Sequence, residues 1–272
     1  MGASWLDTEK EEDNLKQKQM NIEQELNNAF RWRDEKLVFA TETGSRLWGI
    51  ASPDSDYDVR GIYLPSKEEV FDFEKHRDVI DVMDGDFDFS GFHIDKFMNL
   101  VCNGNTTVYE WIRSDQIIVN KLPNWDELKK VLVGGMRADR IYWHYISMAT
   151  GHYRKYLEPE GEYCTYKRLF YTIRGIISAE LAQKGAIPEL DVEKMFKQTD
   201  NPLKYIGMSC LEAKRNSVEK EPIAENKKKT ILRTLKKEMK QVQSHQPKKT
   251  QVSPYMKSYL KDYVYELKNL YY

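Results

Sequence analysis

Two aspartates, Asp56 and Asp58, lie two residues apart in the segment DYDVRGIYL at 56–64. The segment alternates polar and apolar residues, which predicts a half-buried strand. Residues two apart in a strand share one face, so Asp56, Asp58 and Arg60 point to the same side. Carboxylates roughly 6.5–7 Å apart along a strand can both reach a pair of Mg²⁺ ions about 3.5–4 Å apart. Without cations, repulsion would keep at least one of them from ionising readily.

A glycine–serine pair, Gly44 and Ser45, follows the apolar segment KLVFAT at 36–41, which predicts a buried strand. Glycine lets the backbone approach a ligand closely. If a helix begins here, its free backbone N–H groups suit a phosphate. The Ser45 hydroxyl and the Arg46 guanidinium are natural partners for β- and γ-phosphate oxygens. The pair therefore predicts a phosphate-binding turn beside the two aspartates.

A third carboxylate is expected from another strand. The segments 78–83 and 86–89 predict two further strands around Gly85, arranged as a hairpin. Asp88 lies between two phenylalanines, and this pattern places one carboxylate on the open face of its strand. Asp86 lies on the same face and is the alternative.

A helix expected over about 163–184 carries two cations, Lys167 and Arg174, seven residues apart. This spacing is two helical turns, so both cations share a face with Tyr171. Such a helix could lay two cations against a triphosphate. The other interpretation is an ordinary amphipathic helix with solvated cations, and the sequence leaves both open.

The remaining patterns predict an α+β fold, with a small mixed β-sheet core and a helical C-terminal half. The first domain is expected at 1–120, including an N-terminal helix over about 8–32, and the helical domain at 121–272. Ser66 and Glu69 form a capping-box pattern at a helix start, and IDKFMNLVC and TTVYEWI read as two helices. Later helices are expected over about 125–132, 136–157, 163–184, 191–198, 202–214, 225–242 and 254–270.

Charge is unevenly distributed along the chain. The formal net charge is −1, so the whole chain has no field that marks a nucleic-acid binder. Residues 213–250, however, contain twelve lysines and arginines against four glutamates, which leaves a local charge of +8. This run is either a solvated helix face with a loop or a contact for nucleic acid or phosphate.

The composition favours a cytoplasmic protein without a membrane span. Cys102, Cys164 and Cys210 lie far apart, which argues against a zinc site and a disulfide framework and favours a reducing setting. The charged N-terminal segment lacks the apolar stretch of a signal peptide, and no apolar run approaches the ~20 residues of a membrane helix. Nothing in the sequence indicates the oligomeric state.

Other metal and nucleotide motifs do not fit. Asp54, Asp56 and Asp58 share the spacing of an EF-hand calcium loop, but Val59 and Pro65 stand where that loop needs Gly and Glu. The chain has neither a P-loop nor an HExxH pattern. A calcium-binding EF-hand and a P-loop ATPase are therefore excluded.

The Gly-Ser pair, the Asp-x-Asp strand and the third acidic strand together resemble the DNA polymerase β-like nucleotidyltransferase superfamily. More narrowly, GSRLWGIASPDSDYDVRGIYLP, followed by DFSGFHIDKFMNLVCNGNTTVYEWIRS, resembles the predicted nucleotidyltransferases of the RNA-repair-associated (RlaP) branch. The resemblance covers residues 38–115 and, more weakly, the helix at 167–174. Phe92 and His93 depart from it, since relatives are expected to have Trp and Asp there, which puts the substrate preference in doubt.

The resemblance implies a nucleotidyltransferase that moves a nucleoside monophosphate from an NTP to a hydroxyl, releases pyrophosphate and uses two Mg²⁺ ions, with Mn²⁺ as a substitute. Gly44 and Ser45 would hold the triphosphate, while Asp56, Asp58 and Asp88 would bind the metals. An RNA end, including tRNA, is the favoured acceptor; a protein side chain and a small molecule are alternatives. A non-catalytic nucleotide- or nucleic-acid-binding module is the rival hypothesis.

Overall fold

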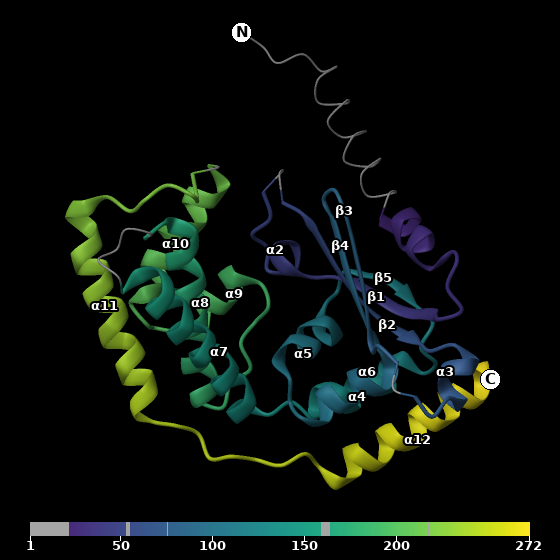
Figure 1. The fold of residues 1–272 in the computed structure, drawn as a ribbon. Helices are drawn as coiled ribbons and strands as arrows, with labels where there is room; N and C mark the ends of the chain where they lie inside the picture. Colours follow the sequence, from purple (N-terminus) through teal and green to yellow (C-terminus); the bar gives the residue numbers. More distant parts are fainter. Residues whose placement is uncertain (1–21, 53–54, 75, 159–163, 217) are drawn as a thin grey trace.

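The computed structural model describes residues 22–52, 55–74, 76–158, 164–216 and 218–272. A five-stranded sheet and a bundle of helices face each other across the molecule (Figure 1). The structure confirms the predicted α+β fold, with a mixed sheet in the first half and helices in the second. Residues 22–30 are helical as expected, whereas the part of the expected N-terminal helix before residue 22 lies outside the described residues.

The sheet has the strand order β3-β4-β2-β1-β5. β2 pairs in parallel with β4, while its other neighbour, β1, is antiparallel. The strands are β1 (Lys36–Glu42), β2 (Tyr57–Leu64), β3 (Val79–Asp84), β4 (Phe87–His93) and β5 (Ile117–Asn120). β5, a four-residue strand at the edge beside β1, was not expected from the sequence.

The helices lie close to the residue ranges that the sequence periodicity predicts. Ser66 caps its helix with the full capping box, in which Glu69 accepts from the Ser66 backbone and its own N–H bonds the Ser66 hydroxyl. The helices are α2 (Gly44–Leu47), α3 (Lys67–Phe71), α4 (Ile94–Cys102), α5 (Thr106–Arg113), α6 (Trp125–Gly134), α7 (Ala138–His152), α8 (Tyr166–Gln183), α9 (Val192–Lys197), α10 (Leu203–Arg215), α11 (Glu225–Ser244) and α12 (Pro254–Tyr271). α7 continues as a π-helix, η1 (Tyr153–Leu157).

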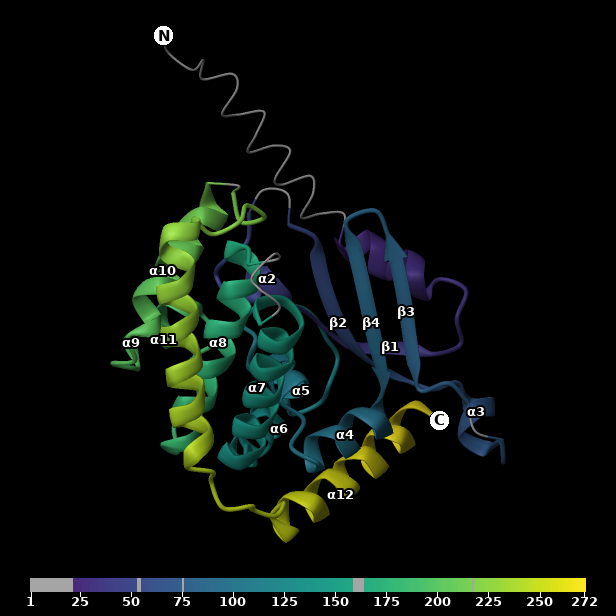
Figure 2. The same cartoon turned by 60° about the vertical axis from the view of Figure 1, so that its left-hand side comes forward.

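The two faces of β2 meet different partners because side chains alternate along a strand. Val59 and Tyr63 pack toward the helix at 22–30. Ile62 and Leu64 pack on the opposite face, in a core shared with α4, α5, α6 and α12. Asp58 and Arg60 continue this second face toward the start of the strand. The polar part of the strand thus lies at the end of the sheet that faces the helical bundle (Figure 2).

The C-terminal helix α12 follows the helical bundle in the sequence but packs on the first half of the chain. It runs beneath α4 toward α3 (Figure 1). Met256, Leu260 and Leu267 are each about fully buried in the same core as Val38 of β1. The last elements of the sequence therefore complete the core of the first half. None of the helices in the described part of the chain is long and apolar enough to span a membrane.

Replacing Leu267 with alanine should destabilise the protein. Leu267 is 1% exposed, so the variant loses apolar burial and leaves a cavity, at a cost of about 2–5 kcal/mol in the free energy of unfolding. Leu270, in the same helix and 70% exposed, is the matched control and should change that free energy by less than about 0.5 kcal/mol. Urea unfolding followed by tryptophan fluorescence measures both. Equal losses would show that α12 is not part of the core.

Candidate active site

The parallel pairing of β2 with β4 sets two of the predicted carboxylates side by side. Asp58 and Asp88 are register partners, so their side chains leave the sheet on one face. Arg60, two residues after Asp58, lies against both. Its Nη2 is 3.3 Å from Asp58 Oδ1 and 3.1 Å from Asp88 Oδ2, and its Nη1 donates to the Asp88 carboxylate and carbonyl. The backbone carbonyl of Asp86, the alternative third carboxylate, accepts the Tyr57 N–H at the start of β2.

The carboxyl group of Asp58 is held in an unfavourable environment for a negative charge. Burial raises its pKa above the usual range, Arg60 opposes the rise, and the charges of Asp88 and Asp56 add to it. Burial and the two neighbouring carboxylates together therefore outweigh the one guanidinium. This end of the sheet favours the approach of a further positive charge.

The Gly44–Ser45 turn is fixed against Asp58 by main-chain contacts. The backbone N–H and the hydroxyl of Thr43 both donate to the Asp58 carbonyl, at 2.7 and 2.9 Å. Gly44 then adopts a φ of +63°, in the left-handed region. A Cβ at this position would lie 2.0 Å from Asp58 Oδ2. Only glycine allows this backbone to pass so close to the carboxylate.

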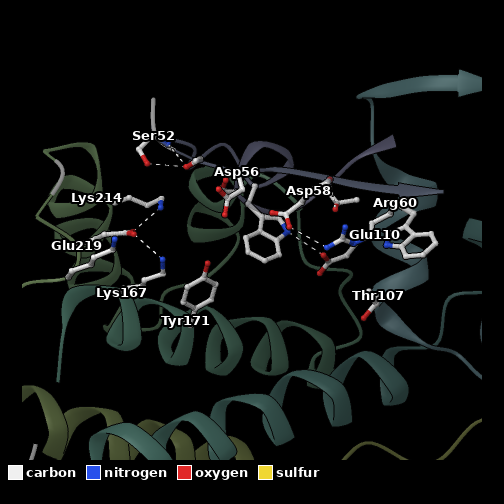
Figure 3. Close-up of a pocket in the computed structure, with 17 residues that line it drawn as sticks. Ser52, Asp56, Asp58, Arg60, Thr107, Glu110, Lys167, Tyr171, Lys214 and Glu219 are labelled. Carbon is white, nitrogen blue, oxygen red and sulfur yellow. Dashed lines mark hydrogen bonds and ion pairs between the residues drawn. The ribbon is translucent and has the colours of Figure 1, made fainter. Parts of the chain in front are cut away.

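A cavity of about 570 Å³ opens between this end of the sheet and the bundle, a size within the range of small-ligand sites. Asp56 and Asp58 lie on one side of it, and Lys167, Tyr171 and Lys214 lie across from them (Figure 3). The cavity is lined by Thr43, Gly44, Ser45, Trp48, Ser52, Ser55, Asp56, Asp58, Arg60, Thr107, Glu110, Trp111, Lys167, Tyr171, Lys214, Glu219 and Lys220. Of the residues predicted from the sequence, it brings together Gly44, Ser45, Asp56, Asp58 and Lys167.

Three predicted residues do not line this cavity. Asp88 contacts Arg60, which lines the cavity, but is not itself part of the lining. Arg46 turns toward the neighbouring strands β1 and β2: its Nε is 3.1 Å from Glu42 Oε1 and its guanidinium lies 3.9 Å from the centre of the Tyr57 ring. Arg174 shares the α8 face with Lys167 and Tyr171 as expected, but it is 4% exposed and engaged in another contact.

That contact is a buried hydrogen-bond network around Glu110 of α5, a residue not predicted from the sequence. Glu110 accepts from Tyr145 Oη at 2.7 Å, from Arg174 Nη2 at 3.1 Å and from Trp48 Nε1 at 3.2 Å. The Arg174 guanidinium also lies 3.7 Å from the centre of the Trp48 ring. Since Trp48 ends α2, this network ties the Gly-Ser turn to the helical bundle.

The acidic end of the cavity has the donor chemistry of a site for a hard divalent cation. Asp56 and Asp58 supply carboxylate oxygens, the ligands that Mg²⁺ prefers. Burial and the neighbouring carboxylates raise the pKa of Asp58, and a cation would favour its charged form. Within the ranges described, however, no three His, Cys, Asp or Glu side chains already form a metal-binding group. The residues fit such an ion in type and charge, with Arg60 in contact with the third carboxylate.

A mixed sheet that carries a Gly-Ser turn beside an Asp-x-Asp strand defines a polymerase β-like nucleotidyltransferase fold. The chain belongs to the RNA repair pathway DNA polymerase beta family, RlaP, whose sequence profile matches residues 18–266. This match confirms the resemblance found in the sequence motifs.

Two relatives and one solved structure were compared with the chain. Uncharacterized protein YcgL of Bacillus subtilis (strain 168) is 35% identical over 188 residues, which cover 68% of this chain and 72% of YcgL. Uncharacterized protein MJ0002 of Methanocaldococcus jannaschii is 27% identical over 201 residues, 72% of this chain and 79% of that protein. The crystal structure of a nucleotidyltransferase-like protein from Exiguobacterium sibiricum matches 79% of this chain and 71% of its own, with 14% identity and a TM-score of 0.34.

Replacing Gly44 with alanine should destabilise the protein more than the same change at Gly185. Both glycines have positive φ, +63° and +82°, and an alanine in this region costs roughly 1–2 kcal/mol. Only Gly44 also has Asp58 in the way, whereas nothing lies within 4 Å of a Cβ at Gly185. Urea titrations of the two variants give the free energies of unfolding. Equal losses would mean that the turn and Asp58 do not touch in solution.

Proposed function

We propose that this protein transfers a nucleoside monophosphate from an NTP to a hydroxyl acceptor at an RNA end and releases pyrophosphate. The observation that carries the proposal is the polarity of the cavity, with Asp56 and Asp58 at one side and Lys167 and Lys214 across from them. A nucleotide needs this combination, because its triphosphate requires cations while the reacting phosphorus requires metal held by carboxylates. Membership of an RNA repair family supports RNA as the acceptor.

The lining residues predicted from the sequence each have a role in this proposal. Gly44 and Ser45 bring the backbone and a hydroxyl to the phosphates, and Lys167 pairs with the far end of the triphosphate. Asp56 and Asp58 would hold the divalent cations, and Asp88, now in contact with Arg60, would be the third ligand. Its register with Asp58 favours Asp88 over Asp86.

Bound Mg²⁺, or Mn²⁺ in its place, would neutralise phosphate charge and favour the ionised form of the attacking hydroxyl. Arg60 offers the carboxylates a positive partner before metal arrives, and so limits their repulsion. Arg46 and Arg174 are paired with Glu42 and Glu110, and we assign both to bracing the Gly-Ser turn.

One observation favours a second candidate function, a nucleotide- or nucleic-acid-binding module without catalysis. Arg60 contacts both Asp58 and Asp88, and such a pairing could replace the metals altogether. Under this alternative, the carboxylates serve only the fold.

The acceptor is tested by incubating the protein and Mg²⁺ with labelled NTPs and a cell extract separated into tRNA, protein and small-molecule fractions. Label in the RNA fraction is expected, because the chain belongs to an RNA repair family. Label in protein or in a small molecule would move the acceptor to that class. An absence of label from every fraction would support the binding module.

Substituting Asp56 or Asp58 with asparagine should lower the rate of transfer about 10²–10³-fold, the size typical of losing a group that stabilises transition-state charge. The side chains keep their shape and lose only their charge. Asp115→Asn is the control, since its side chain is 94% exposed and outside the cavity lining, and its rate should stay unchanged. Product formation is followed by gel or thin-layer separation. Equal rates in all three variants would contradict the proposed roles.

The double variant Asp56→Asn/Asp58→Asn should also lose affinity for Mn²⁺. Removing direct ligands should exceed the roughly 10–100-fold loss that follows removal of an outer-shell partner. Electron paramagnetic resonance of free Mn²⁺, titrated with protein, measures the affinity without any turnover. Retained binding in the double variant would place the metal elsewhere.

A further inference from the structure

The basic end of the cavity contains a carboxylate that the proposed reaction does not use. Glu219 lies between two lysines, with Oε2 2.8 Å from Lys214 Nζ and Oε1 3.1 Å from Lys167 Nζ. Figure 3 shows the three side chains converging at the left of the cavity. Lys220, the next residue, also lines the space. Glu219 thus lies where the cavity presents its positive charge.

Main-chain bonds hold Glu219 in this position. The loop after α10 runs beside the start of α8, where Lys167 N–H donates to the Glu219 carbonyl at 2.9 Å and Tyr166 N–H donates to the Glu221 carbonyl at 3.3 Å. Further along the loop, Ile223 N–H donates to the Cys164 carbonyl at 2.8 Å. These main-chain hydrogen bonds hold Glu219 beside the lysines, so its ion pairs are not a chance contact between mobile surface side chains.

Glu219 is charged in this environment. Burial alone would raise the pKa of its carboxyl, but the hydrogen bonds from Lys214 and Lys167 outweigh burial and hold that pKa below its usual range. Its side chain is 15% exposed and that of Lys214 12%, so the pair is shielded more than an ordinary surface ion pair. The lysines consequently have a bound anion before any ligand arrives.

Tyr171 connects this end of the cavity with the catalytic end. It lines the same space, and burial raises the pKa of its phenol, on which the charges of Lys167, Glu219 and Asp58 also act. A polyanion held at the lysines therefore lies next to the carboxylate end of the same cavity.

We propose that Glu219 is a built-in counter-ion that occupies the polyphosphate subsite, and that the triphosphate tail of the nucleotide displaces it from Lys167 and Lys214. This inference rests on the proposed function for the identity of the ligand. The exchange replaces a single carboxylate charge with a multiply charged phosphate chain on the same lysines. Glu219 also keeps the lysines from binding weaker anions when nucleotide is absent, because each such anion must compete with it.

The test is calorimetric titration of the full-length protein with inorganic tripolyphosphate, at fixed ionic strength and without divalent cations. Glu219→Gln removes the competing charge but keeps the shape of the side chain, so its affinity should rise about ten-fold. Lys214→Met should weaken binding. Glu193→Gln is the matched control, since Glu193 pairs with Arg215 outside the cavity lining, and its affinity should not change. Thermal unfolding verifies that each variant is folded.

The sign of the Glu219→Gln effect decides between the two roles. If Glu219 only ordered the lysines, the variant would bind tripolyphosphate equally well or more weakly, and the proposal would be overturned. A gain in affinity for a short single-stranded RNA without a gain for tripolyphosphate would also overturn it. Because the titration involves no turnover, it stands or falls independently of the transfer assay.

Discussion

Repulsion between neighbouring carboxylates is the constraint on which this site depends. The parallel register of β2 and β4 forces Asp58 and Asp88 onto one face, and Asp56 adds a third negative charge nearby. Arg60, on the same strand as Asp58, contacts both Asp58 and Asp88. Arg60 thus supplies one positive charge against three carboxylates, so the cluster keeps a net negative charge. In the metal binding that we propose, a divalent cation would supply the missing positive charge.

The opposite end of the cavity repeats this arrangement with the signs reversed. There the lysines of α8 and α10 are paired with Glu219, as the aspartates are paired with Arg60. Both ends therefore have an internal partner of opposite charge, which lowers the cost of holding like charges together in a partly buried space. The Glu110 network lies between the sheet and the bundle and fixes their separation through Trp48 and Arg174.

Local patterns in the sequence were enough to predict much of this arrangement. Alternation around Asp58 gave the correct face of β2, and the acid between two phenylalanines gave Asp88 its place on β4. Amphipathic periodicity located the helices, including the α8 face shared by Lys167 and Tyr171. The short edge strand β5 was not predicted, because four residues are too few to show an alternating pattern of polar and apolar side chains.

Contacts among distant elements could not be predicted in the same way. Glu110 looks like any polar residue on an amphipathic helix until Trp48, Tyr145 and Arg174 are packed around it. Arg46 and Arg174 have long side chains that pair with the nearest carboxylate, which only the fold determines. Lys214 belonged to the basic run at 213–250, but nothing local separated it from the lysines of α11, which packs along the outer side of the bundle (Figure 1).

The return of α12 to the first half has a consequence for synthesis of the protein. Met256, Leu260 and Leu267 share a core with strand and helix residues near the beginning of the sheet. While the ribosome is still translating the bundle, that core lacks one wall, and apolar side chains of α4 remain open to solvent. Contacts of such long sequence separation form late and slowly. The core of the first half is therefore complete only once α12 has been synthesised and has packed against α4.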